Sequence, residues 1–217
     1  MGSDQKTTQS DARRVGEILA VLATGIGKFI FMDWLNLKLQ YIVAAIIFWV
    51  IYVGLRKRAN KDLLRHWGFR MDNFGLAWKM VLPFGIVAVI SFVTIGIIQN
   101  TINITWHILP ILVVYPIWGV IQQFLVIGLV AGNLQDIESV KIHKTVTIVA
   151  TALLFGAIHY PYNWLIIGTF VLALFYGFVY LRIRNVWVLG LFHGWLGGLF
   201  FYTVVDRDPF LEVFGNL

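Results

Sequence analysis

Residues 106–132 read WHILPILVVYPIWGVIQQFLVIGLVAG and decide the fold class of this chain. The stretch contains no Asp, Glu, Lys or Arg, and two adjacent glutamines, Gln122 and Gln123, interrupt its apolar run. An α-helix needs about 20 mostly apolar residues to cross the hydrocarbon core of a bilayer. This segment is therefore long enough to cross the membrane while tilted, or to continue past the interface.

The composition of the whole chain agrees with a membrane protein. Of the 217 residues, 59% are hydrophobic and only 13% are charged, and the mean hydropathy is +0.79. A soluble globular domain carries roughly 25% charged residues. The absence of cysteine excludes thiol chemistry and disulfides. The net charge of +6 is better explained by membrane orientation than by nucleic-acid binding, which we set aside.

The apolar segments predict an all-α, polytopic membrane helix bundle with about seven transmembrane helices. We expect a tail at 1–15, a single transmembrane helical domain at 16–205 and a short C-terminal tail at 206–217. The candidate spans are residues 16–35, 38–55, 76–98, 106–132, 145–160, 163–181 and 186–205.

The distribution of Lys and Arg predicts the orientation, because short cytoplasmic loops accumulate basic residues. With the N-terminus in the cytoplasm, fourteen of the seventeen basic residues fall on that side, and only Lys28, Lys38 and Arg207 do not. The C-terminus is then outside the cytoplasm, and we expect a bacterial inner or plasma membrane. The cytoplasmic set comprises Lys6, Arg13, Arg14, Arg56, Lys57, Arg58, Lys61, Arg65, Arg70, Lys79, Lys141, Lys144, Arg182 and Arg184.

Polar groups at depth in the spans are the functional candidates. All eleven carboxylates lie in tails, in loops or near span ends, which leaves Gln122, Gln123, His159 and His193 inside the bilayer. Each of these alone also fits a structural role, because glutamines can link neighbouring helices and histidines can pack with one partner. Their presence on three separate spans favours a shared site with amides and imidazoles but no acids.

Two further patterns bear on this site. Gly190, Gly194 and Gly198 recur every four residues, a spacing that lets helix backbones approach closely and would bring His193 against a neighbouring helix. His159 and His193 could also ligate zinc, but catalytic zinc usually takes three protein ligands. No third ligand is evident in the spans, so we expect no cofactor, with zinc as the less favoured alternative.

The motifs over about residues 110–200 resemble the CAAX protease and bacteriocin-processing (CPBP, or Abi) family, which includes the type II CAAX prenyl endopeptidases. Its members carry Glu-Glu-x-x-x-Arg-Gly, Phe-x-x-x-His and His-x-x-x-Asn motifs on successive spans. Here QQFLVIG stands at 122–128, FGAIH at 155–159 and HGWLG at 193–197. The resemblance implies a helical membrane fold and catalytic positions at Gln122, Gln123, His159 and His193. Phe155, Asn163 and Trp195 are additional candidates for contacting a bound molecule.

The departures from the family pattern affect its chemistry. Glutamines replace both glutamates, Ile127 replaces the arginine and Gly197 replaces the asparagine. The family is thought to activate water with its first glutamate, and a glutamine amide cannot accept that proton near neutral pH. An engineered Glu-to-Gln pair would not require the changes at 127 and 197, so the pattern indicates natural divergence.

We therefore expect a catalytically impaired family member that binds peptides or lipidated protein tails, or that scaffolds a membrane partner. One alternative is an active intramembrane endopeptidase whose carboxylate comes from Asp33, Glu138 or a partner, or whose activity uses a metal on His159 and His193. A second alternative is a small transporter or channel-like protein, although the internal repeats typical of transporters are not evident.

Overall fold

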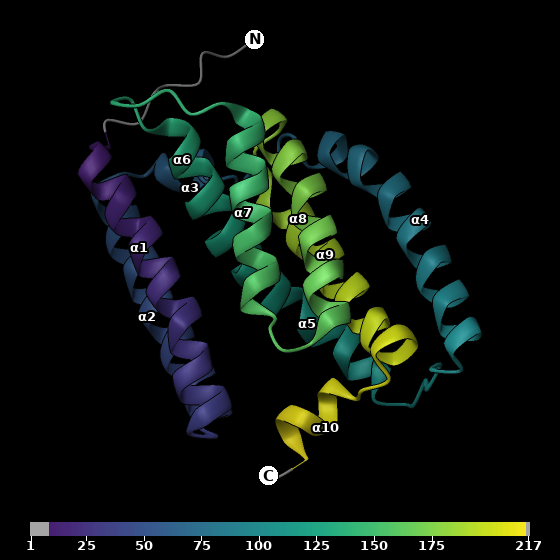
Figure 1. The fold of residues 1–217 in the computed structure, drawn as a ribbon. Coiled ribbons are helices and arrows are strands. Elements are labelled where there is room, and N and C mark those ends of the chain that lie inside the picture. Colours follow the sequence, from purple (N-terminus) through teal and green to yellow (C-terminus); the bar gives the residue numbers. More distant parts are fainter. Residues whose placement is uncertain (1–8, 216–217) are drawn as a thin grey trace.

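The computed structural model describes residues 9–215, which fold into a bundle of helices with no strand in this range (Figure 1). Lys6, which contributed to the predicted orientation, lies outside the described residues. The elements are α1 (Asp11–Gly27), the π-helix η1 (Lys28–Trp34), α2 (Lys38–Ala59), α3 (Leu63–His66), α4 (Phe74–Gln99), α5 (Ile108–Gln123), the π-helix η2 (Phe124–Ala131), α6 (Gly132–Asp136), α7 (Lys144–Ile158), α8 (Asn163–Arg182), α9 (Val186–Phe200), the π-helix η3 (Phe201–Val205) and α10 (Pro209–Phe214).

Six continuous helical segments of the described chain are long and apolar enough to cross a membrane. The all-α membrane bundle is therefore confirmed. The fifth expected span differs, because α7 has 15 residues and extends only about 22 Å, less than the roughly 30 Å of a hydrocarbon core. The six segments are Asp11–Trp34, Lys38–Ala59, Phe74–Gln99, Ile108–Asp136, Asn163–Arg182 and Val186–Val205.

Successive helices run in opposite directions, so the loops gather at two ends of the bundle (Figure 1). We call one end the N-face; it holds the start of α1 and the loops 60–73, 137–143 and 183–185. The other end, the C-face, holds the loops 35–37, 100–107 and 159–162 together with α10. The predicted cytoplasmic basic residues that the structure describes belong to helix ends and loops of the N-face.

The centre of the bundle is built on the contact between α5 and α9, and glycine makes this contact possible. A Cβ atom on Gly190 would overlap the backbone of Val120, and one on Gly194 would overlap the backbone of Pro116. The close helix approach predicted from the glycine spacing is therefore present, with α5 as the partner. It holds the middle of α9 directly against the last two turns of α5.

The remaining helices pack around this pair in different ways. α7 and α8 pack against each other and against η2, and α4 covers another side of α9. α1 contacts η2 and α6, whereas α2 lies at the periphery with Trp49 as its buried side chain. Most of α2 and α4 is consequently left to face lipid.

Candidate functional site

The membrane-embedded site is centred on a hydrogen bond between α5 and α9. Gln122 lies midway along the span Ile108–Asp136, and its Oε1 is 2.8 Å from Nε2 of His193. The amide oxygen can only accept, so Nε2 carries the proton and Nδ1 is the acceptor of the neutral ring. Nδ1 is buried and has no hydrogen-bond partner among the described residues.

Gln123 is enclosed more completely than Gln122. Its side chain is fully buried, and neither its amide nitrogen nor its amide oxygen has a hydrogen-bond partner in the described part of the chain. The π-helix η2 begins at the next residue, and π-helical turns often occur at functional sites. A buried amide without partners costs about 1–3 kcal/mol, so hydrogen bonds to this group would lower the free energy of the protein.

Phe155 connects the two histidines of the predicted site. Its ring centroid lies 5.5 Å from that of His193 and 4.9 Å from that of His159. His159 caps the C-terminal end of α7, where its Nδ1 donates to the carbonyl oxygen of Phe155 at 2.7 Å. The structure thus brings Gln122, His193 and Phe155 together, with His159 one turn further towards the C-face.

The other two predicted contact residues lie elsewhere. Asn163 is exposed at the first turn of α8 on the C-face. Trp195 points to a different side of α9 from His193, where its indole nitrogen donates to the carbonyl oxygen of Leu112 at 3.2 Å and its ring meets Trp78 edge-on. Trp195 therefore helps to join α9 to α5 and α4, and a role in binding stays a prediction for both residues.

The two departures from the family's arginine and asparagine have different surroundings. Ile127 is fully buried in the hydrophobic core, one helical turn beyond Gln123. Gly197 has open space beside it, because the nearest atom to an added Cβ is the ring of Tyr115 at 4.0 Å. An arginine at 127 would need an acidic partner, whereas an asparagine at 197 fits without one.

Carboxylates do not gather at this site. In the described chain, no three His, Asp or Glu side chains are placed so that they could hold a metal ion. Asp33 pairs with Lys28 at 2.7 Å, and Lys28 in turn donates to the carbonyl oxygen of Tyr160 at 2.9 Å. Asp33, offered above as one alternative source of a carboxylate, is thus linked through Lys28 to the residue after His159.

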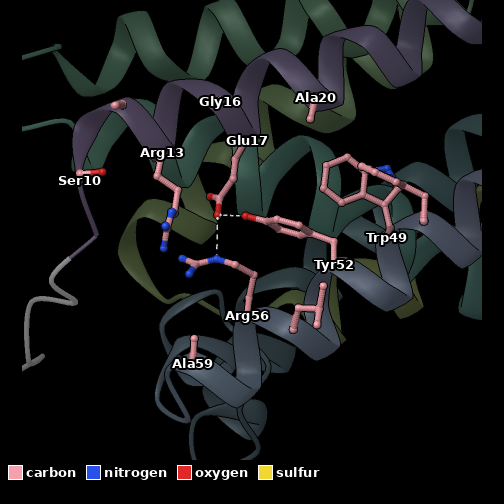
Figure 2. A pocket seen from close by; sticks show the side chains of 12 residues that line it. Ser10, Arg13, Gly16, Glu17, Ala20, Trp49, Tyr52, Arg56 and Ala59 are labelled. Carbon is pink, nitrogen blue, oxygen red and sulfur yellow. Dashed lines mark hydrogen bonds and ion pairs between the residues drawn. The ribbon is translucent and has the colours of Figure 1, made fainter.

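A buried carboxylate that the sequence reasoning missed lies nearer the N-face. Glu17 is 3% exposed and accepts hydrogen bonds from the Tyr52 hydroxyl and, at 2.7 Å, from the Asn133 amide. The Nε of Arg56 lies 3.6 Å from the same carboxylate (Figure 2). The spacing of Glu17, Val21 and Gly25 on one helix face was the signal for this burial, because such residues share one side of α1.

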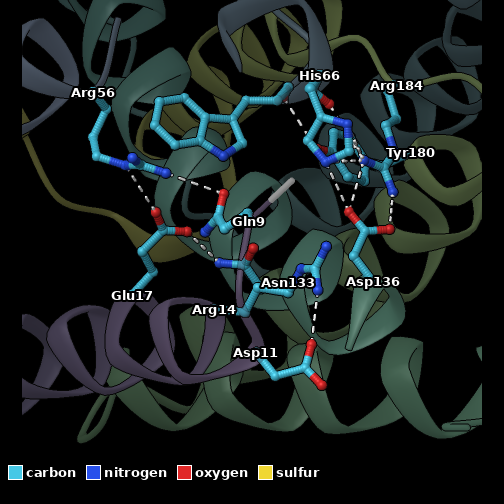
Figure 3. A network of polar contacts seen from close by, with 11 residues as sticks. Gln9, Asp11, Arg14, Glu17, Arg56, His66, Asn133, Asp136, Tyr180 and Arg184 are labelled. Atoms are coloured by element: carbon cyan, nitrogen blue, oxygen red, sulfur yellow. Dashed lines mark hydrogen bonds and ion pairs between the residues drawn. The ribbon is translucent and has the colours of Figure 1, made fainter. Parts of the chain in front are cut away.

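A second cluster at the N-face joins three separate elements. The guanidinium of Arg184 donates two hydrogen bonds of 2.5 and 2.9 Å to the carboxylate of Asp136. His66 Nε2 lies 2.9 Å from Oδ2 of the same aspartate (Figure 3). The guanidinium also lies 5.9 Å from the ring of Tyr180. These contacts tie the end of α6 to α3 and to the loop before α9, so they stabilise the N-face.

Comparison with known proteins identifies one family. Residues 102–198 match the family described as Rce1-like, type II CAAX prenyl endopeptidase Rce1-like. Neither the curated proteins nor the solved structures gave a match. The match begins just before α5 and ends within α9, so it includes Gln122, Gln123, Phe155, His159 and His193. Residues 102–198 of this integral membrane protein are therefore similar to the type II CAAX prenyl endopeptidase Rce1-like family.

Proposed function

We propose that this Rce1-like protein is catalytically impaired and binds a peptide or a lipidated protein tail at the Gln122–His193 site. One observation carries the proposal: the amide of Gln122, where the family has a carboxylate, is hydrogen-bonded at 2.8 Å to His193, one of the two retained motif histidines. A carboxylate there could accept a proton from water, and a glutamine cannot.

The same geometry supports binding. His193 Nδ1 is a buried acceptor and the Gln123 amide offers both donors and an acceptor, all without partners among the described residues. A peptide group carries one N–H and one C=O and would satisfy such atoms. Removing unsatisfied buried polar atoms favours the bound state by the penalty that they impose in the free protein.

The orientation of the site follows from the basic residues. We infer that the N-face is cytoplasmic, because its helix ends and loops contain Arg56, Lys57, Arg58 and Lys61 while the C-face has few basic residues. A lipidated tail anchored in the cytoplasmic leaflet would then reach the site from the N-face half of the bilayer.

A binding experiment tests this function. Purified protein in detergent is titrated with a fluorescent prenylated CAAX peptide, and bound peptide is afterwards checked for cleavage by mass spectrometry. We expect saturable binding of intact peptide, weakened in the double variant Gln122→Leu/His193→Ala. The matched control is Ser91→Ala, since in the described part of the chain that hydroxyl donates to the carbonyl oxygen of Val87 on its own helix. Equal binding by the double variant would contradict the proposed site.

Restoring the family's side chains tests why activity is lost. The variant combines Gln122→Glu, Gln123→Glu, Ile127→Arg and Gly197→Asn. The glutamate at 123 and the arginine at 127 must be introduced together, because each alone would be a buried charge without a partner. We expect peptide cleavage to appear in this variant if the remaining bundle still positions the substrate. An inert but folded variant would show that the surroundings of the site have diverged as well.

A further inference from the structure

A pocket of about 730 Å³ lies between α1 and α2 on the N-face half of the bundle, outside the Rce1-like region. Its lining includes Arg13, Gly16, Glu17, Trp49, Tyr52 and Arg56 (Figure 2). The two helices that form it are candidate membrane spans, so the pocket opens within the depth of a lipid leaflet. Neither its residues nor its position are used by the Gln122–His193 site.

The pocket changes from cationic to apolar with depth. Its outer part holds the side chains of Arg13 and Arg56, and its inner part is lined by Ala20, Phe48 and Trp49. Arg13 and Ala20 are seven residues apart on α1, which places them about 10 Å apart along the helix axis. A membrane lipid has the same polarity gradient, with a headgroup at the interface and a chain beneath it.

The cations of the pocket exceed its anions. Arg56 lies 3.6 Å from Glu17, and that carboxylate is also covered by Tyr52 and Asn133. Arg13 is exposed, and its guanidinium group has no hydrogen bond or ion pair within residues 9–215. Figure 2 shows the Arg13 and Arg56 side chains pointing into the same space. Two converging guanidinium groups with a single, covered carboxylate leave a net positive charge at the pocket mouth.

We propose that this pocket binds an anionic phospholipid, with its phosphate on Arg13 and Arg56 and an acyl chain along Ala20 and Phe48. Guanidinium groups bind phosphate oxygens through paired N–H donors. Basic pockets between transmembrane helices on the cytoplasmic side are suited to anionic headgroups. The apolar inner lining selects a lipid over a soluble phosphate, because only a lipid would cover both parts of the pocket.

Native mass spectrometry of the full-length protein in detergent tests the proposal with phosphatidylglycerol and, for comparison, phosphatidylcholine. We expect preferential binding of phosphatidylglycerol, weakened about fivefold by Arg13→Gln, which matches the contribution of one basic residue near an anionic lipid. The control Arg58→Gln removes the same charge from the N-face end of the neighbouring helix α2, outside the pocket lining, and should leave binding unchanged. Equal losses in the two variants would overturn the proposal.

Filling the pocket gives a second, independent test. A Cβ atom on Gly16 would have no heavy atom within 4 Å, so Gly16→Leu can fold and place its side chain in the pocket. Gly54 on α2 is equally open but does not line the pocket, which makes Gly54→Leu the matched control. We expect Gly16→Leu alone to abolish preferential lipid binding. Unchanged lipid binding in Gly16→Leu, or displacement of the lipid by inorganic phosphate, would contradict the proposed phospholipid site.

Discussion

At the N-face, the carboxylates of Glu17 and Asp136 each meet several hydrogen-bond donors, whereas the Gln122–His193 site in the middle of the membrane contains only amides and imidazoles. Both regions join helices that are distant in sequence. They differ in whether removal of one polar side chain would leave a partner with an unpaired charge. At the N-face a missing carboxylate would expose a guanidinium without its partner, while at the centre the corresponding charges are already absent.

From this difference we expect the two regions to tolerate substitutions differently. A charge inside the membrane is stable only with an opposite charge or several donors beside it. With amides at 122 and 123, an arginine at 127 would have no carboxylate to pair with. Ile127, which stands there instead, is fully buried and carries no charge that would have to be desolvated. At the N-face, Glu17 and Asp136 remain, and each has hydrogen-bond donors beside it.

The largest expected effect concerns the helix contact that supports the central site. In Gly190→Ala the added methyl group would overlap the Val120 backbone, so α5 and α9 must separate. We expect a loss of about 3 kcal/mol in the free energy of unfolding, measured by thermal unfolding in detergent. Gly197→Ala is the control on the same helix, since its methyl group would meet only the Tyr115 ring at 4.0 Å. Equal stability of the two variants would refute the close contact.

The next effect tests the N-face. Asp136→Asn leaves Arg184 and His66 without their carboxylate, and its side chain is 18% exposed. We expect a loss of about 2 kcal/mol, somewhat below the usual penalty for breaking a fully buried ion pair. Asp72→Asn, at the exposed pairs with Arg65 and Arg70, should change stability far less. A smaller loss of stability in Asp136→Asn than in Asp72→Asn would contradict the greater stabilising role of the Asp136 cluster.

At the C-face, the stability of the protein is expected to depend on pH through Asp208. Burial opposes ionisation of Asp208, but hydrogen bonds from His107 and Tyr202 outweigh it and lower the pKa of this carboxyl. Its stabilising effect is therefore full above its unfolded pKa of about 4 and declines as pH falls from there through the lower folded pKa. We expect thermal stability to drop below about pH 4, and Asp208→Asn to reduce that drop. An unchanged pH profile in the variant would contradict this role.

The smallest expected effect lies at the central site. Gln122→Leu removes one hydrogen bond to His193 within the membrane, where such bonds contribute on the order of 1 kcal/mol or less. Stability should therefore change less than in Asp136→Asn, although peptide binding should weaken. A stability loss larger than that of Asp136→Asn would indicate that Gln122 is chiefly a structural residue.

Much of this architecture could be predicted from sequence, because membrane spans and glycine spacing are local signals. The apolar segments located the helices, and the four-residue glycine spacing predicted the close approach of α9 to a neighbour. The spacing of Glu17 on α1 indicates a buried helix face, but the partners of its carboxylate, Tyr52, Asn133 and Arg56, come from other helices and could not be predicted from that spacing. The structural role of Trp195 likewise depends on its contacts with α4 and α5, and a short sequence motif does not indicate which helices pack against it.

A cleavage assay on a prenylated CAAX peptide, with purified wild-type protein and a His159→Ala/His193→Ala variant, with and without added zinc, tests the central claim most directly. Products are followed by mass spectrometry. We expect no turnover above background in either protein, because the Gln122–His193 pair contains no carboxylate to activate water. Turnover by the wild type that disappears in the histidine variant would contradict it.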